Sequence, residues 1–314
     1  MTQPASLAGI TFYQPPLTAV LTGRDGRVQL PYGDLPIPLQ EEDFAALAGA
    51  EPSYDAVGRG LAAALRMDPD LPHGARYALM LQQGYPHLFA ELASELVMLD
   101  RKDVEAPYLD RKINYLKVFA LLEPTNHRLP LQIGATFLEK GLRLSILHQA
   151  TFNLYRAERY LKEALEMMPT DVQARHLLGE VSFLLGKYDK VRELWGSLQT
   201  ELAVADQELV ARRLARIESN DLPLVPAVDY LQAIGMAMEA FDIGDYEESA
   251  AILQDVMADA AFYSEFPLAE ISYLLGLSYV RQGITGYGAQ FLRQALALRP
   301  DYPEAQETLA TLAG

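Results

Sequence analysis

Residues 172–191 read VQARHLLGEVSFLLGKYDKV, a helical pattern that is interrupted once. A small residue, Gly179, is followed seven positions later by Gly186 and then by an aromatic residue, Tyr188. Glycine readily adopts the left-handed backbone that ends many helices, so Gly186 predicts the end of a first helix. Gly179 would let that helix come close to a second one that begins near Tyr188. The stretch therefore predicts two antiparallel helices joined by a short turn.

The same step of seven residues occurs twice more. Gly276 leads to Gly283, and Ala237 leads to Gly244. The return helices share a second pattern, in which three small or apolar residues precede a closing proline at spacings of 4, 3 and 5. The sets are Ala157, Leu161, Ala164 and Pro169; Gly288, Leu292, Ala295 and Pro300; and Val57, Leu61, Ala64 and Pro69. Because proline cannot continue a helix, each set predicts the end of a unit.

These residues resemble the tetratricopeptide repeat (TPR), a helix–turn–helix unit of about 34 residues. The resemblance is closest at 172–198 and 269–302, clear at 138–171 and 230–259, and weaker at 41–71 and 86–126. The large aromatic residue that usually opens the first helix is replaced here by Arg175, Ala233 and Ser272. The resemblance implies an all-α fold, a right-handed αα solenoid over residues 41–314.

Three segments lie outside the repeating units. Segments 72–83 and 206–219 predict extra helices between units, which would make the solenoid irregular. Segment 303–313 predicts a C-terminal capping helix, because the last unit would otherwise expose its apolar face.

Residues 1–40 are rich in proline and glycine and lack the helical period. Two short β-type runs, 18–22 and 27–30, flank Asp25 and Gly26, a dipeptide suited to tight hairpin turns. We therefore expect an extended N-terminal segment, 1–40, that contains a small β-hairpin. A lone hairpin is marginally stable in water, so it must pack on something. It would either cap the first helices or lie as an arm in a groove of the same chain.

Composition excludes several functional classes. The chain has 314 residues, of which 50% are hydrophobic, and it has no cysteine, which excludes disulfides and thiolate sites. Its formal net charge of −16 makes nucleic acid a poor partner. No apolar stretch reaches the roughly 18–20 residues of a transmembrane helix. Residues 1–23 also lack the basic start of a signal peptide, so we expect a cytoplasmic protein without a membrane partner.

The TPR resemblance implies a concave face lined by the first helix of each unit, where members of the family usually hold a peptide or helix. Alignment places on that face His176, Glu180, Phe183 and Leu184; then Ile234, Met238, Phe241 and Asp242; and finally Tyr273, Leu277, Val280 and Arg281. The Lys, Arg and Asn side chains with which some members bind a C-terminal carboxylate are missing. The mostly apolar lining suits an amphipathic helix or a hydrophobic peptide. The same residues would also suit a core between tightly packed helices, and the N-terminal arm could itself fill the groove.

Acidic residues are concentrated in one part of the chain. From Ile217 to Val280 there are twelve Asp and Glu residues and no Lys or Arg. This stretch is either a solvated surface or a surface that attracts a basic partner. Just before it, Arg212, Arg213 and Arg216 lie close together, either paired with acidic residues of the same chain or available for a contact between domains or copies.

The sequence gives no sign of catalysis. The histidines His73, His87, His127, His148 and His176 include no pair at the spacing of a helical metal site. We therefore expect no catalytic residue, no metal and no cofactor. The expected function is a non-catalytic scaffold that binds a protein or peptide of basic character on the concave face. The alternative is a self-associating structural subunit of a larger assembly.

Overall fold

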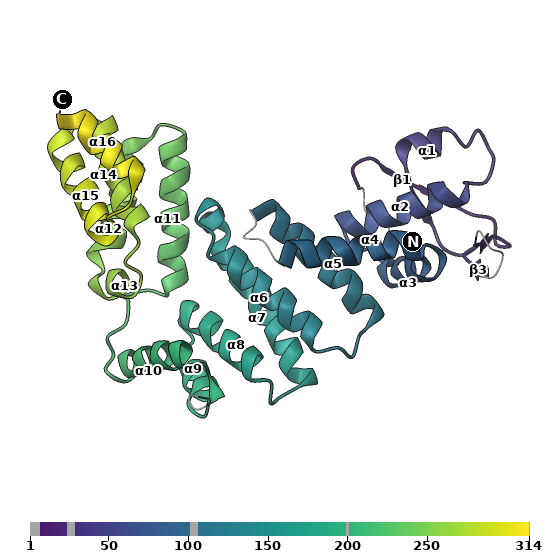
Figure 1. Ribbon diagram of the computed structural model, residues 1–314, viewed down its shortest axis with the longest axis horizontal. Coiled ribbons are helices and arrows are strands. Elements are labelled where there is room, and N and C mark those ends of the chain that lie inside the picture. Colours follow the sequence, from purple (N-terminus) through teal and green to yellow (C-terminus); the bar gives the residue numbers. More distant parts are fainter. Residues whose placement is uncertain (1–6, 24–28, 101–105, 199–200, 314) are drawn as a thin grey trace. The chain divides into compact units, whose positions relative to one another are not determined.

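The computed structural model describes residues 7–23, 29–100, 106–198 and 201–313 (Figure 1). Contacts divide the chain into two compact units. The N-terminal unit holds Met1–Thr136 with Glu166–Pro169, and the C-terminal unit holds Phe137–Leu165 with Thr170–Gly314. The boundary expected at residue 40 therefore lies within the N-terminal unit.

The predicted β-hairpin is present in the N-terminal unit. Strand β2 (Val20–Thr22) pairs antiparallel with β3 (Gln29–Pro31), and Leu21 lies opposite Leu30. The expected turn at residues 25–26 lies outside the described residues. This hairpin confirms the small β-containing segment that the sequence predicts.

A second sheet, which the sequence analysis missed, joins β1 (Ile10–Tyr13) antiparallel to β4 (Ile37–Gln40). Pro38 is tolerated because a two-stranded sheet leaves one edge of β4 free. Helix α2 (Tyr54–Met67) packs directly on this strand. At Gly60 the contact is so close that a Cβ atom would lie 1.8 Å from the Pro38 carbonyl oxygen.

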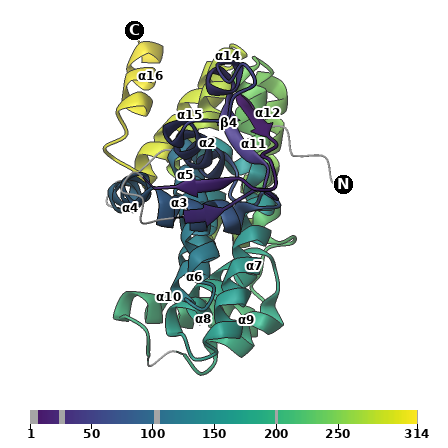
Figure 2. The same ribbon diagram turned by 90° about the vertical axis from the view of Figure 1, so that its right-hand side faces the viewer.

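The N-terminal segment and the first helices share one hydrophobic core. Figure 2 shows the backbone of strand β4 and helix α2, which contact each other. Side chains with no exposed surface come from both parts: Leu35, Ile37, Leu39, Val57, Leu61 and Leu65. The Tyr77 hydroxyl donates a hydrogen bond to the Pro36 carbonyl oxygen at 2.5 Å. The described part of the segment therefore caps the first helices, which is one of the two alternatives left by the sequence.

The remaining helices of this unit only partly follow the repeat. They are α1 (Glu41–Ala45), α3 (Gly74–Gly84), α4 (Pro86–Asp100), α5 (Ala106–Leu122) and α6 (Arg128–Gly141), which crosses the boundary between the units. Helix α3 is the extra helix expected at 72–83. The weak unit at 41–71 lacks a full first helix, because α1 spans one turn and strand β4 packs against α2 instead.

The C-terminal unit is helical throughout its described residues. Its elements are η1 (Leu144–Gln149), α7 (Ala150–Met167), α8 (Val172–Leu184), α9 (Tyr188–Trp195), α10 (Val204–Glu218), α11 (Ala227–Asp242), α12 (Tyr246–Ala258), α13 (Ala260–Glu265), α14 (Ala269–Arg281), α15 (Thr285–Leu298) and α16 (Pro303–Ala313). The pairs α8/α9, α11/α12 and α14/α15 are the predicted units, α10 is the predicted extra helix, and α16 packs on α15 as the predicted cap. The short helix α13 was not predicted.

Glycine ends the first helix of each of these pairs. Gly186, Gly244 and Gly283 have φ angles of +70°, +87° and +81°, a conformation that costs other residues energy. The backbone N–H of Gly244 donates to the Phe241 carbonyl oxygen at 3.0 Å, which closes the end of α11. The turn glycines predicted from the sequence are therefore confirmed.

Close approach within a pair is clearest between α8 and α9. A Cβ atom on Gly179 would lie 2.0 Å from Nε1 of Trp195, which is fully buried. The indole N–H donates a hydrogen bond to the His176 carbonyl oxygen at 3.1 Å. Trp195 therefore occupies the space that the missing side chain leaves.

The Gly179→Ala variant should lower the free energy of unfolding of the C-terminal unit by about 1–3 kcal/mol, because Trp195 must shift to admit the methyl group. The control is Gly286→Ala, where no heavy atom lies within 4 Å of the added Cβ and stability should be kept or slightly raised. Trp195 is the only tryptophan of the chain, so its fluorescence during a urea titration reports directly on this unit. Equal transition midpoints for the two variants would contradict the packing described.

Candidate partner-binding surface

All twelve residues predicted to line a partner-binding face lie in the C-terminal unit, on α8, α11 and α14. Three of them are buried within the chain: Phe183, Leu184 and Ile234. Two are exposed: Asp242 and Arg281. The other seven are half-buried: His176, Glu180, Met238, Phe241, Tyr273, Leu277 and Val280. The surface open to a partner is therefore smaller than the sequence suggested.

Helix α10 explains the burial on α8. The Arg213 guanidinium carbon lies 4.5 Å from the centre of the Phe183 ring, and Arg213 Nη1 lies 3.8 Å from Glu180 Oε1. Phe183 is 2% exposed and also stacks near Trp195, with 6.4 Å between ring centres. The expectation that Phe183 faces a partner is thus corrected, because Arg213 of α10 covers its ring. The expectation for Leu184 is corrected as well, because this side chain is 1% exposed.

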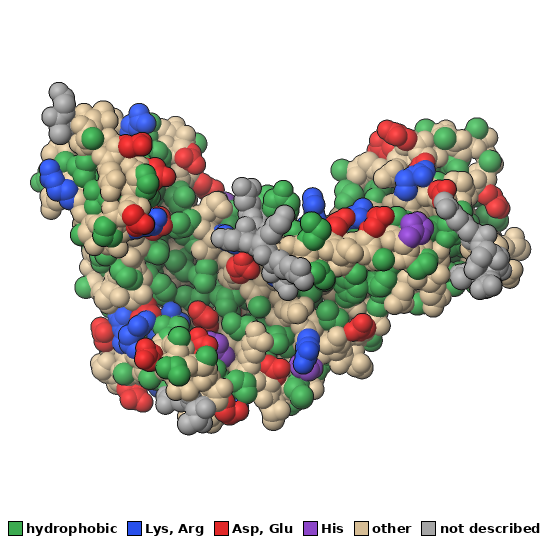
Figure 3. Space-filling model, in the orientation of Figure 1, with side chains coloured by type: hydrophobic (Ala, Val, Ile, Leu, Met, Phe, Trp, Pro, Cys, Tyr) green, Lys and Arg blue, Asp and Glu red, His purple; other side chains and the backbone are tan. Residues whose placement is uncertain are grey.

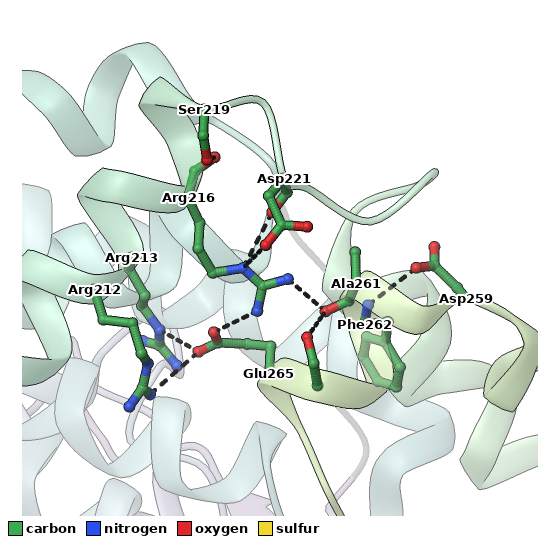
Figure 4. A network of polar contacts seen from close by, with 10 residues as sticks. Arg212, Arg213, Arg216, Ser219, Asp221, Asp259, Ala261, Phe262 and Glu265 are labelled. Carbon is green, nitrogen blue, oxygen red and sulfur yellow. Dashed lines mark hydrogen bonds and ion pairs between the residues drawn. The ribbon is translucent and has the colours of Figure 1, made fainter.

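All three arginines of the α10 cluster lie close to one carboxylate, that of Glu265, as Figure 4 shows. Glu265, at the end of α13, has a side chain that is 2% exposed. Its Oε1 accepts from Arg213 Nε at 2.8 Å, and its Oε2 accepts from Arg216 Nη1 at 2.9 Å. Arg212 Nη2 lies 3.8 Å from the same carboxylate. Of the two alternatives from the sequence, the structure therefore shows pairing within the chain, which fixes α10 against α13.

Ile234 is buried where α11 packs on η1. A Cβ atom on the neighbouring Gly235 would lie 2.1 Å from the backbone nitrogen of His148. Across this contact, Thr151 and Gln232 join their side chains by a hydrogen bond. Ile234 itself is therefore not accessible to a partner.

What remains is a surface on α11 and α14, which contact each other. It consists of Met238, Phe241, Asp242, Tyr273, Leu277, Val280 and Arg281 and is called the α11–α14 surface below. The Phe241 ring packs edge-on against Tyr246 at 5.1 Å, and Tyr273 packs against Tyr302 at 4.8 Å. Each ring is thus supported on one side while part of it stays accessible. Such half-buried rings can take apolar side chains of a peptide without a large loss of conformational entropy.

A buried carboxylate fixes the start of α11, and the sequence analysis did not single it out. Asp259 accepts hydrogen bonds from the Tyr230 hydroxyl at 2.6 Å and from the backbone N–H groups of Leu224 at 2.8 Å and Phe262 at 3.0 Å. Burial by itself raises the pKa of Asp259, but these hydrogen bonds outweigh it and lower the pKa below its usual 3.8. Burial, with the bond to Asp259, raises the pKa of Tyr230 to about 12. The proton therefore stays on tyrosine, and the ionised Asp259 joins the loop before α11 to α13.

Half of the acidic residues in 217–280 are engaged in such local contacts. Besides Asp259 and Glu265, Asp221 pairs with Arg216, Glu239 with His148, Glu270 with Arg299, and Asp245 caps α12. The other six are exposed and have no cationic partner among the described residues: Glu218, Asp229, Asp242, Glu247, Glu248 and Asp255. On the face seen in Figure 3, acidic and basic side chains are interspersed rather than gathered in one patch.

Within the described ranges, no three His, Asp or Glu side chains converge as metal ligands would. Among the helices described, none is long and apolar enough to cross a bilayer.

The pairs α8/α9, α11/α12 and α14/α15, with their left-handed turn glycines, reproduce the sequence pattern. The fold is TPR-like. Comparison with protein-family models gives no match, and neither does comparison with curated proteins.

Several solved structures are similar to this TPR-like chain. The TPR domain of P58(IPK) has 16% identity and a TM-score of 0.33, with 71% of this chain and 55% of that chain covered. MamA 41-end from Desulfovibrio magneticus RS-1 has 13% identity and a TM-score of 0.29, and the match covers 68% of this chain and 95% of that chain. A tetratricopeptide repeat protein from Parabacteroides merdae ATCC 43184 has 16% identity and a TM-score of 0.27, and the match covers 87% of this chain and 97% of that chain. The chain thus spans about half of the P58(IPK) structure. Since these scores are low, the TPR-like assignment stands on the helix pairs of this chain.

Removing the negative charge of Glu265 should strongly lower the free energy of unfolding of the C-terminal unit. In the Glu265→Gln variant, Arg213, which is 5% exposed, loses the anion it contacts most closely, and we expect a loss of about 3–5 kcal/mol in the free energy of unfolding. The control is Asp221→Asn, because the Asp221 side chain is 60% exposed and should contribute less than about 1 kcal/mol. Urea titrations of both variants measure the difference. A loss at Glu265 no larger than that at Asp221 would contradict the buried network.

The stabilisation that ionised Asp259 contributes should depend on pH and should decrease on acidification. Its pKa is lower in the folded chain than in the unfolded chain, so its stabilisation is complete above the unfolded value of about 3.9 and is lost as the pH falls through the folded value. The difference in unfolding free energy between wild type and Asp259→Asn should therefore be constant from about pH 7 to about pH 5 and shrink below about pH 4. Thermal unfolding across this range measures it. A difference that grows on acidification would contradict the assignment.

Proposed function

We propose that the chain is a non-catalytic scaffold that holds a peptide or helix of a protein partner on the α11–α14 surface. The observation that supports this most is that five apolar side chains of two contacting helices stay only half-buried, whereas Phe183, Leu184 and Ile234, the other apolar residues predicted to line the face, are buried. Soluble proteins rarely leave such apolar groups together without a use.

The chemistry of this surface favours an amphipathic partner. Leu277 and Val280 offer aliphatic area, while Met238 is flexible enough to adapt to different side chains. Asp242 and Arg281, both exposed, could pair with charges at the edge of a bound segment. An amphipathic helix that presents one apolar stripe with charged flanks matches this arrangement.

We further propose that the partner is basic. The six exposed and unpaired acidic residues of 217–280 would attract cationic residues, which raises the rate of association at low salt more than the final affinity. The cytoplasmic location expected from the sequence is kept as part of this proposal.

A second candidate is self-association. It is favoured by exposed aromatic residues on α7, a helix that does not belong to the α11–α14 surface. Phe152 is 57% exposed and Tyr155 is 52% exposed.

The Phe241→Glu variant should lose at least about tenfold in capture of its partner from a lysate, because a charged group replaces the central ring of the surface. The matched control is Met236→Glu on the same helix, where the side chain is 52% exposed and the helical period places it on another side of α11 than Met238 and Phe241. Affinity capture with quantitative mass spectrometry measures both, and circular dichroism verifies the fold. Equal capture by the two variants would argue against the α11–α14 surface.

A further inference from the structure

Helix α7 presents an exposed stripe of aromatic and basic side chains in the C-terminal unit. Phe152, Tyr155, Arg156 and Arg159 follow at spacings of three and four, which places them on one side of the helix. The two rings are each more than half exposed. This group is called the α7 stripe below.

The stripe is ordered by its own contacts. The Arg156 guanidinium carbon lies 5.0 Å from the centre of the Phe152 ring. Lys187 Nζ lies 4.8 Å from the centre of the Tyr155 ring and is itself held by Glu158 Oε2 at 2.7 Å. Among the described residues, no carboxylate lies within ion-pair distance of Arg156 or Arg159. Aromatic residues and arginine held in this way are the types that contribute most to protein interfaces.

The turn between α11 and α12 has the opposite chemistry. Ile243 is 83% exposed at its tip, and the exposed Asp242 and Glu247 flank it. The turn is fixed in shape, because Gly244 has a φ of +87° and Asp245 accepts a hydrogen bond from the Glu248 N–H at 3.1 Å. It is therefore an ordered apolar tip with acidic sides.

We infer that the α7 stripe of one copy binds the α11–α12 turn of a second copy of this chain. Ile243 would pack against the Phe152 and Tyr155 rings, while Asp242 and Glu247 would pair with Arg156 and Arg159. Charge complementarity selects this occupant, because the chain itself carries an apolar tip with acidic sides that matches an aromatic surface with basic sides. Since the two surfaces differ, the contact is heterologous and would build a ring or an open series of copies.

The net charge of −16 opposes this contact at a distance. At an ionic strength of about 0.15 M the Debye length is about 8 Å, so repulsion between whole chains is largely screened while ion pairs at contact still act. Association should therefore be tested near this ionic strength. The proposed contact gives the self-association candidate a defined interface that shares only Asp242 with the α11–α14 surface. Phe241→Glu alters the α11–α14 surface alone, and the reversal of Arg156 and Arg159 alters the self-contact alone, so either proposal can fail without the other.

Sedimentation velocity of the full chain over a range of concentrations tests the interface. Wild type should associate reversibly, while the double variant Arg156→Glu with Arg159→Glu should bind itself at least about a hundredfold more weakly, because like charges then face each other. The double variant Asp242→Lys with Glu247→Lys should be weakened in the same way. The control, Lys190→Glu with Arg192→Glu on α9, makes the same change of net charge as the first variant and should associate as wild type does.

Mixing the two reversed variants provides the deciding result. Each should be monomeric alone, and the mixture should associate again, because the unaltered turn of the first variant then meets the unaltered stripe of the second, and the reversed stripe meets the reversed turn. A wild type that stays monomeric at every concentration overturns the inference. Association that survives either reversal, or a mixture that stays monomeric, overturns it as well.

Discussion

The structure of the C-terminal unit depends on the close approach of antiparallel helices at small residues. Gly179 admits Trp195, and Gly276 admits α15, with a Cβ there reaching 3.0 Å from the Gly288 carbonyl oxygen. Because no side chain separates the helices at these points, the remaining apolar side chains interdigitate and bury most of the faces within a pair.

Helix α10 modifies this regular arrangement. It brings three arginines against Glu265 and covers Phe183 with a guanidinium group, so the face of α8 is used inside the chain. A buried ion pair of this kind adds little net stability against an apolar contact of the same shape, but removing one partner is costly. Its effect here is on position, since the Arg213 guanidinium removes Phe183 from the accessible surface of α8.

The helix pairs could be predicted because their signals are local, namely a small residue, a glycine seven positions later and a closing proline. Strands β1 and β4 were missed because their pairing joins residues more than twenty positions apart. The burial of Phe183 and Ile234 was missed for a related reason. A helical period shows which face of a helix is apolar, but not whether α10, η1 or a partner covers it. The role of Asp259 was hard to predict, because aspartate is a common N-cap residue and Asp259 is one of twelve acidic residues in the stretch 217–280.

The central claim is that a partner binds on α11 and α14 and not on α8. Hydrogen–deuterium exchange of the chain, with and without the captured partner, tests it most directly. The account predicts slower exchange on binding in residues 238–242 and 273–281, with no change in residues 176–184. Slower exchange confined to α8, or to helices outside the C-terminal unit, would contradict it.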